Sequence, residues 1–266
     1  MTIIQAAILG LVQGLTEFLP VSSSGHLLLV ERLFGLKNSS LLFSVLLHLG
    51  TLLAVIVVYR KRIWKMIRRI PDMFRHPLKN EFLLLIVATI PAVIAALVID
   101  FDDAFAGEYL GFSFLLTTLI LWLSDLVSGL APQIKKVGLP QAIVMGIMQA
   151  VAILPGVSRS GSTIAGGVSA GLSRKRAADF AFLMAIPAIL GSAVLEGVKL
   201  IRNPEVVTGS WMPIIVGVLV SAAAGYLAIR LMLKIIRRVR LTWFGVYTGV
   251  LGILVLLDQY MFHYFF

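Results

Sequence analysis

Long apolar runs separated by short polar stretches dominate the chain. Six of these runs contain enough consecutive apolar residues, about 17–25, to cross a lipid bilayer as a helix. They extend from Leu41 to Tyr59, Phe82 to Ile99, Leu110 to Leu126, Phe180 to Leu200, Trp211 to Leu233 and Trp243 to Phe262. The pattern predicts an all-α integral membrane protein with six transmembrane helices.

Clusters of Lys and Arg predict how these helices are oriented. They occur at residues 60–69, 135–136, 174–176 and 234–240, and the positive-inside rule places all four on the cytoplasmic face. The segment from Asp100 to Glu108 is acidic and has no Lys or Arg, so it is predicted outside, as is the loop from Arg202 to Ser210. Both chain termini are then predicted on the extracytoplasmic face.

Two further apolar stretches, residues 2–36 and 139–172, are broken near their middle by Pro, Ser and Gly. With the loops oriented as above, each stretch must begin and end on the same side of the membrane. Non-helical backbone is tolerated at membrane depth where protein or a wet cavity surrounds it. Both stretches are therefore predicted to be re-entrant helical hairpins.

The two broken stretches also resemble each other in sequence. The segment QAAILGLVQ (5–13) resembles QAIVMGIMQ (141–149), and PVSSSG (20–25) resembles PGVSRSG (155–161). Each half of the single membrane domain, residues 1–133 and 134–266, would hold one hairpin and three crossings. Because three is odd, the second half is predicted to be inverted, an inverted-topology repeat whose two loops meet near the midplane.

Composition narrows the classes of function. Hydrophobic residues make up 59% of the 266 residues and charged residues 14%, against about 45–50% and about 25% in soluble domains. The chain has no cysteine, which excludes thiolate nucleophiles, disulfides and cysteine-based zinc sites. The net charge of +10 lies in short loops without interleaved aromatic residues, so nucleic acid is not an expected partner.

The first broken stretch carries candidate catalytic residues. Gln13 and Glu17 share a helix face one turn before Pro20, and a charge at membrane depth costs about 2.5–3.5 kcal/mol, so Glu17 should face a polar interior. The segment SSSGH (22–26) follows, with hydroxyl groups, a conformationally free glycine and His26. Glu17, Ser22, Ser23, Ser24, Gly25 and His26 together supply a nucleophile, a proton-transfer group and a carboxylate that orients His26 or holds a metal ion. Helix capping by the serines and a packing role for Glu17 stay open as alternatives.

The second broken stretch carries a candidate anion site. Arg159 is the single cation of residues 139–172, and its neighbours Ser158, Ser160, Gly161 and Thr163 are small and mostly hydroxylated. A guanidinium pairs with phosphate bidentately, and a glycine-rich turn that opens a helix presents its amides to anions. An ion pair between Arg159 and Glu17 is the alternative, and an empty site could hold that pair. His48, inside the first crossing, is expected to make an interhelical hydrogen bond.

The segments QGLTEFLPVSSSGH (13–26) and PGVSRSGST (155–163) resemble the two signature motifs of the bacterial undecaprenyl-pyrophosphate phosphatases, the bacitracin-resistance family. The resemblance covers essentially the whole chain. It implies a bacterial plasma-membrane enzyme that hydrolyses undecaprenyl pyrophosphate to undecaprenyl phosphate and inorganic phosphate, recycling the carrier lipid for peptidoglycan. It also implies that Glu17, Ser23, His26 and Arg159 are essential, with Gln13 at a position where other members have Glu.

These residues support a mechanistic hypothesis. Arg159 and the loop amides bind the pyrophosphate, Ser23 or His26 attacks the terminal phosphorus, and Glu17 orients the base or a Mg²⁺ or Ca²⁺ ion. Gln13 weakens a metal site that needs two carboxylates. The rival interpretation is a polyprenyl-phosphate flippase or anion transporter, because transporters share the inverted-repeat architecture. Membrane lipids are expected partners, and the sequence leaves a homodimer open.

Overall fold

The computed structural model describes residues 1–36, 41–73, 75, 77, 80–98, 107–128, 134–202 and 211–264. Its helices are α1 (Ile3–Phe18), α2 (Ser23–Leu33), α3 (Leu41–Arg68), α4 (Glu81–Val98), α6 (Leu110–Val127), α7 (Leu139–Val151), α8 (Arg159–Ser169), α9 (Arg174–Arg202), α10 (Trp211–Ile235) and α11 (Leu241–Leu257). Within these ranges, extended pairing is limited to one isolated bridge between Ile134 and Leu172. The predicted all-α class is confirmed.

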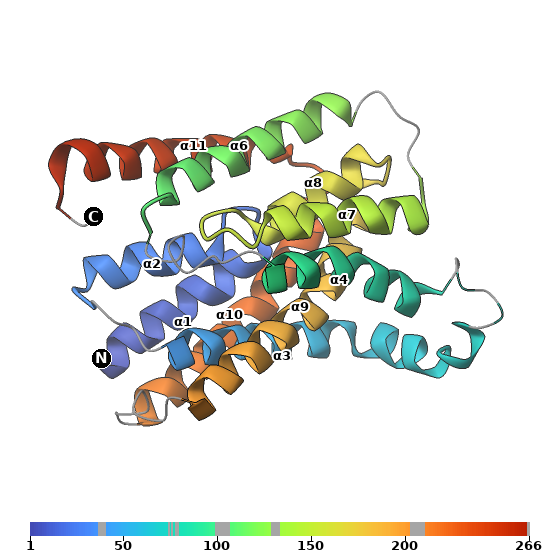
Figure 1. Ribbon diagram of the computed structural model, residues 1–266, viewed down its shortest axis with the longest axis horizontal. Coiled ribbons are helices and arrows are strands. Elements are labelled where there is room, and N and C mark those ends of the chain that lie inside the picture. Colours follow the sequence, from blue (N-terminus) through green and yellow to red (C-terminus); the bar gives the residue numbers. More distant parts are fainter. Residues whose placement is uncertain are drawn as a thin grey trace.

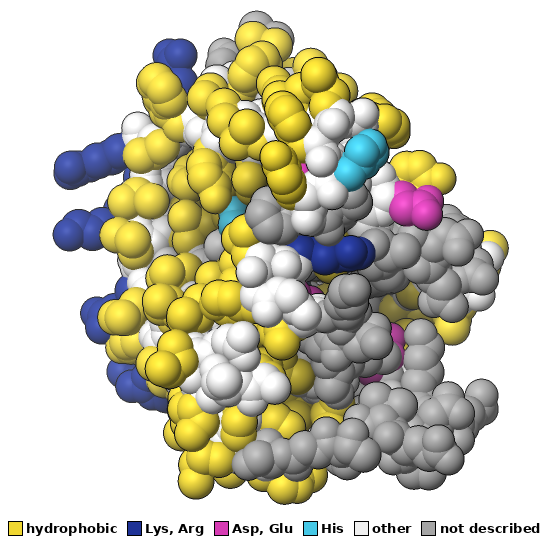
Figure 2. Space-filling view, turned by 90° about the vertical axis from the view of Figure 1, so that its left-hand side faces the viewer, with side chains coloured by type: hydrophobic (Ala, Val, Ile, Leu, Met, Phe, Trp, Pro, Cys, Tyr) yellow, Lys and Arg dark blue, Asp and Glu magenta, His cyan; other side chains and the backbone are white. Residues whose placement is uncertain are grey.

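Six helices are long and apolar enough to cross a membrane, and each overlaps one of the six predicted runs. Their outward faces carry large apolar side chains such as Leu219 and Leu227 on α10, which are 64% and 63% exposed. Hydrophobic side chains also cover much of the end viewed in Figure 2, where Lys and Arg project at one edge. So much exposed hydrocarbon requires lipid around it, and the chain is an integral membrane protein.

Two helix boundaries differ from the sequence-based boundaries by six residues or more. The first crossing does not end at Tyr59 but continues to Arg68, and the fourth begins at Arg174, not Phe180. The basic residues predicted as loops are therefore helical turns at both places, because Lys and Arg are good helix formers and can reach water from a helix that leaves the bilayer. Residues 99–106 and 203–210, which include most of the two predicted outside loops, lie outside the described residues.

Most helices run along the long axis of the molecule (Figure 1), with α6 and α11 on one side and α3, α9 and α10 on the other. The α1–α2 pair reaches the centre from one end and the α7–α8 pair from the opposite end. Both chain termini lie at the end from which α1 starts. The loops that interrupt the two broken stretches are consequently brought toward each other.

The two helices α1 and α7 are too short to cross a bilayer, and each packs against a long neighbouring helix. Their 16 and 13 residues span about 24 Å and 20 Å, less than the hydrocarbon thickness of about 30 Å. A Cβ added at Gly14 of α1 would lie 2.6 Å from the carbonyl oxygen of Ser221 on α10. A Cβ added at Gly146 of α7 would lie 2.6 Å from the carbonyl oxygen of Ala88 on α4. Glycine at these points allows the backbones of the paired helices to approach closely.

Candidate active site

The first loop forms where α1 ends at Phe18 and Pro20 prevents the helix from continuing. Ser22 caps α2, because its Oγ accepts a hydrogen bond from the Gly25 amide at 3.3 Å. Its backbone φ is +70°, a left-handed conformation that residues with a Cβ rarely adopt. Strain of this kind is concentrated at functional sites, and here it gives the sharp turn that starts α2.

The second loop repeats this capping arrangement. Ser158 caps α8 by accepting a hydrogen bond from the Gly161 amide at 3.0 Å. Thr117 of the neighbouring helix α6 also fixes this loop. Its Oγ1 accepts a hydrogen bond from the Ser158 amide at 3.0 Å and lies 3.2 Å from the carbonyl oxygen of Gly156. Ser22 and Ser158 occupy equivalent positions of the sequence repeat, and each caps its helix with the same side-chain hydrogen bond, although Ser158 has a φ of −70°.

The two loops contact each other directly. The Ser160 hydroxyl donates to the Leu19 carbonyl at 2.7 Å, and the Gly156 amide donates to the Ser24 hydroxyl at 3.4 Å. These contacts bring the amino-terminal ends of α2 and α8 together. Because each helix amino terminus carries a partial positive charge, the junction favours an anion.

Glu17 is the centre of the hydrogen-bond network at this junction, although only 5% of its surface is exposed. Its Oε2 accepts hydrogen bonds from the Ser23 hydroxyl at 2.5 Å and from the Gln13 amide at 2.9 Å. Its Oε1 forms an ion pair with the Arg159 Nη2 group. One buried carboxylate thus joins a hydroxyl of the first loop to the guanidinium of the second.

Two polar atoms at the junction are buried and, among the described residues, have no hydrogen-bond partner. They are Arg159 Nη1 and Gln13 Oε1. A buried donor or acceptor left unpaired costs about 1–3 kcal/mol, more when it is charged, so a ligand, an ion or water that paired these atoms would be stabilised here. The Nη1 group offers hydrogen atoms to an anion while Nη2 remains on Glu17.

His26 contacts Tyr247 of α11 and has no hydrogen bond to Glu17 among the described residues. Its Nδ1 lies 2.7 Å from the Ser22 carbonyl oxygen, which can only accept, so Nδ1 carries the proton in the neutral ring. Nε2 then accepts a hydrogen bond from the Tyr247 hydroxyl at 2.7 Å, and the two rings stack at 5.6 Å and 13°. Phe114 meets the imidazole edge-on at 5.7 Å. The sequence-based hypothesis that Glu17 orients His26 finds no support in these contacts, because Ser22 and Tyr247 orient it instead.

Sequence reasoning did not single out Thr117 and Tyr247, and it gave His48 a different contact. Tyr247 is 221 positions from its partner His26, so no local pattern could connect them. His48 Nδ1 bonds the Ser44 carbonyl of its own helix at 2.8 Å, so the interhelical hydrogen bond expected of it is wrong. Its Nε2 lies 3.7 Å from Glu17 Oε2 instead. A histidine inside an apolar run needs a polar neighbour, and this could have indicated that His48 lies beside the site.

The remaining predicted ligand residues mainly shape the loops. The Thr163 hydroxyl bonds carbonyl oxygens of its own helix, at 2.8 Å to Arg159 and 3.2 Å to Ser160. A Cβ added at Gly25 would lie 2.5 Å from the Phe114 ring, and one at Gly161 would lie 3.1 Å from Pro20. These two glycines let the loops approach their neighbours.

The donors at the junction limit what metal site they can form. Among the described residues, no three His, Cys, Asp or Glu side chains cluster closely enough to hold an ion by themselves. Glu17 with the unpaired Gln13 Oε1 supplies two oxygen atoms, and Mg²⁺ is commonly held by one or two carboxylates together with substrate phosphates. The site fits a divalent cation shared with a phosphorylated ligand, not a cation held by protein alone.

The fold and these contacts define a class: an integral membrane protein in which two capped serine-glycine loops meet around one buried carboxylate paired with an arginine. Comparison with known proteins gives the family. Residues 6–254 match the model of the family described as bacitracin resistance protein BacA, and the chain belongs to that family.

Curated relatives cover nearly the full length. The chain is 43% identical over 261 residues to the undecaprenyl-diphosphatase of Carboxydothermus hydrogenoformans, covering 96% of this chain and 97% of the relative. It is 40% identical over 277 residues to the undecaprenyl-diphosphatase of Methanobrevibacter smithii, covering 97% and 98%. With the protein of the same name from Halothermothrix orenii the identity is 35% over 262 residues, again covering 97% and 98%.

Proposed function

We propose that this protein is an undecaprenyl-diphosphatase, which hydrolyses the terminal phosphate of undecaprenyl pyrophosphate to give undecaprenyl phosphate and inorganic phosphate. The names of its full-length relatives support the reaction. The observation that carries the proposal is the bonding of Glu17 to both the Ser23 hydroxyl and the Arg159 guanidinium. A nucleophile, a base and a phosphate-binding cation thereby meet at one buried point.

Binding of the pyrophosphate uses the groups that the junction leaves available. Arg159 Nη1 donates to the terminal phosphate, and the amino-terminal ends of α2 and α8 add the partial charges of their amides. With Nη1 on the phosphate and Nη2 on Glu17 Oε1, the negative charge of the phosphate offsets part of the positive charge that the guanidinium presents to Glu17. The carboxylate then becomes a stronger base at the moment when the substrate is in place.

The contacts favour Ser23 over His26 as the nucleophile, because the Ser23 hydroxyl already donates to a carboxylate while both ring nitrogens of His26 have other partners. Ser23 Oγ forms a bond to the terminal phosphorus and its proton passes to Glu17. The bond between that phosphorus and the bridging oxygen breaks, and undecaprenyl phosphate leaves with the electron pair. Glu17 gives the first proton to the departing undecaprenyl phosphate and is a carboxylate again. Water then attacks the phosphoserine and passes a proton to Glu17, which returns it to Ser23 Oγ as inorganic phosphate leaves.

A divalent cation, Mg²⁺ or Ca²⁺, is proposed as a cofactor held by Glu17 and Gln13 together with phosphate oxygens. When bound, it would neutralise charge on the transferred phosphate. Glu17 accepts the serine proton whether or not the ion shares its other oxygen atom.

The basic test is release of inorganic phosphate from undecaprenyl pyrophosphate by the purified protein in detergent. We expect turnover without a sealed membrane, because all proposed steps occur at one site. The rival function, lipid or anion transport, needs two compartments. If the detergent-solubilised protein released no phosphate while sealed vesicles showed protein-dependent lipid movement, the hydrolase proposal would be wrong.

Arg159→Lys is expected to lower kcat/KM for this substrate about a hundredfold. Lysine keeps the charge but loses the planar fork that can hold Glu17 and a phosphate at the same time. The matched control is Arg174→Lys, which changes a guanidinium that is paired with Asp125 at 2.7 Å at the start of α9. Steady-state phosphate release checks both variants, and equal losses would mean that the arginine fork has no special role at the loops.

Tyr247→Phe is expected to lower kcat about tenfold and leave KM within about twofold. We propose that Tyr247 is a positioning residue, since its hydroxyl holds Nε2 of His26 while its ring still stacks in the variant. The control is Tyr226→Phe, which removes a hydroxyl bonded by Arg230 on the surface of α10. The pH profile of kcat should change shape only for Tyr247→Phe, and an unchanged profile would remove Tyr247 from the mechanism.

The arrangement in the membrane is part of the proposal. We propose a bacterial plasma-membrane location with both termini extracytoplasmic, two inverted repeats at residues 1–133 and 134–266, and re-entrant hairpins whose loops lie near the midplane. The position of both termini at one end of the molecule supports this (Figure 1). The sequence leaves a homodimer open.

A further inference from the structure

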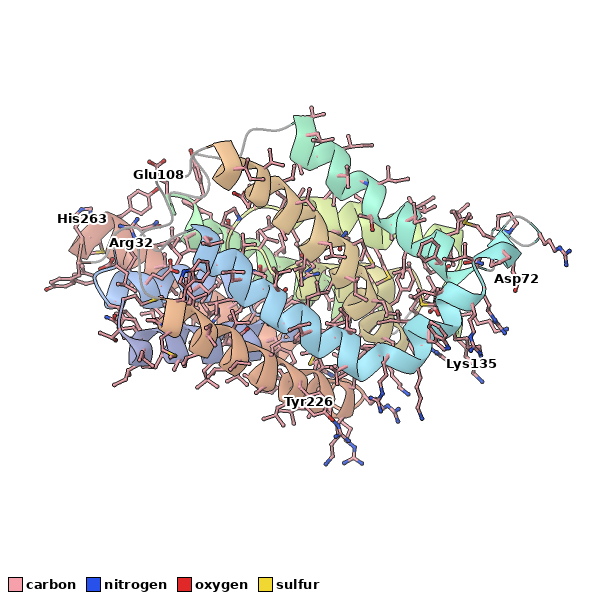
Figure 3. The ribbon with its side chains drawn as sticks, turned by 90° about the horizontal axis from the view of Figure 1, so that it is seen from below. Arg32, Asp72, Glu108, Lys135, Tyr226 and His263 are labelled. Carbon is pink, nitrogen blue, oxygen red and sulfur yellow. The ribbon has the colours of Figure 1, made fainter. Side chains whose placement is uncertain are left out.

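A second feature of the molecule lies far from the two loops: a cavity of about 1050 Å³ at the basic end. It is bounded by the end of α3, the start of α4, the start of α7 and the first turn of α9. Its lining includes Asp72 and Lys135, which Figure 3 shows at the end opposite Arg32, Glu108 and His263. No residue of the two loops contributes to it, so the proposed hydrolysis does not explain it.

Positive charge converges on this cavity from separate parts of the chain. The six basic side chains that line it are Arg62, Lys65, Arg69, Lys135, Lys136 and Arg176. Against these six stand two acidic residues, Asp72 and Glu81, and Glu81 is already bonded to Arg62. Among the described residues, the other five cations have no ion-pair partner. A concave surface with unpaired charges of one sign concentrates its field on an anion.

The wall between these cations is apolar in part, and the side-chain amides of Asn80 and Gln141 complete it. Met66, Phe82, Leu84 and Val137 line the same cavity, and the lining has no Ser, Thr or His among the described residues. A small inorganic anion gains nothing from contact with an apolar wall, whereas the hydrocarbon chains of a phospholipid can pack against it. The absence of hydroxyl and imidazole groups from the described lining favours binding over chemistry.

We propose that this cavity binds a phosphate-bearing anion and that its occupant is the head group of an anionic phospholipid. The positive-inside rule expects this end at the cytoplasmic leaflet, where anionic lipids attract basic residues. The lipid phosphate lies among the lysines and arginines, and its chains leave along the apolar wall. This binding is independent of the hydrolytic reaction at the loops.

The test measures binding of short-chain phosphatidylglycerol to the full-length protein in detergent by titration calorimetry. Each lysine near an anionic lipid contributes about fivefold in affinity, so K135Q/K136Q is expected to weaken binding about tenfold or more. The matched control K61Q/K234Q removes two exposed lysines that do not line the cavity. It should change the dissociation constant less than about twofold.

A second cavity pair, K65Q/R176Q, repeats the measurement on two other elements and guards against a local folding defect in the first pair. Equal weakening by the cavity and control pairs would show diffuse attraction and overturn the proposal. Absence of phosphatidylglycerol binding to the unmutated protein would overturn it too. Phosphatidylcholine of the same chain length should bind more weakly. If inorganic phosphate bound as tightly as phosphatidylglycerol, the proposal of a lipid ligand would be wrong and the occupant would be a free anion.

Discussion

Glu17→Gln is expected to reduce kcat for phosphate release by about a thousandfold or more, within the range of 10² to 10⁴ that positioned acid–base groups contribute. Glutamine has nearly the same shape but cannot accept the Ser23 proton, and it leaves Arg159 without its anionic partner. Substrate binding should survive, because the guanidinium then has only the phosphate to bind. Steady-state kinetics, with KM compared alongside kcat, separate the two effects.

The matched control for this prediction is Glu81→Gln. Glu81 forms a comparable pair with Arg62, at the basic end and away from both loops. If loss of an arginine–carboxylate pair simply weakened the fold, both variants would lose activity and melting temperature together. We expect the large loss in kcat only for Glu17→Gln, and parallel losses would mean that Glu17 acts through stability.

Ser23→Ala is expected to reduce turnover by about 10⁴-fold or more and to eliminate the covalent phosphoenzyme, since a nucleophile and its base act as one unit. Rapid quenching of the unmutated protein with labelled substrate should trap phosphate on Ser23. Phosphoserine survives acid and phosphohistidine does not, so acid treatment distinguishes Ser23 from His26 as the attacking group.

Ser24→Ala is the control, because this neighbouring hydroxyl contacts Ser22 and the Gly156 amide but has no hydrogen bond to Glu17 among the described residues. It should retain the phosphoenzyme and lose no more than about tenfold in rate. An acid-labile phosphoenzyme in the unmutated protein would transfer the nucleophile's role to His26. If no covalent species formed, water would be the attacking group.

The membrane class and its six crossings were readable from the chain, because a span of about 20 apolar residues is a local property of the sequence. The ends of the spans were less accurate. The run ending at Tyr59 continues as helix to Arg68. An apolar run marks only the part of a helix that lies in lipid, whereas helix propensity is the same on both sides of the membrane surface. A helix can leave the lipid without ending.

The candidate site was readable in part, for a similar reason. Glu17 and Arg159 are charges inside apolar stretches, and such charges need a partner wherever the chain places them. The sequence could therefore pose their pairing as one alternative. It left open whether Glu17 serves His26 or Ser23, because both follow within ten residues of Glu17 along the chain.

By itself, the sequence determined the class of protein, the two broken stretches and the residue types able to handle a phosphate, since these depend on composition and local spacing. Only the tertiary structure decided which groups touch. It turned His26 toward Tyr247, placed His48 and Thr117 beside the loops, and joined Ser23 to Glu17. Such contacts follow from how α3, α6 and α11 pack around the loops, and packing between distant segments leaves no periodic trace in the sequence.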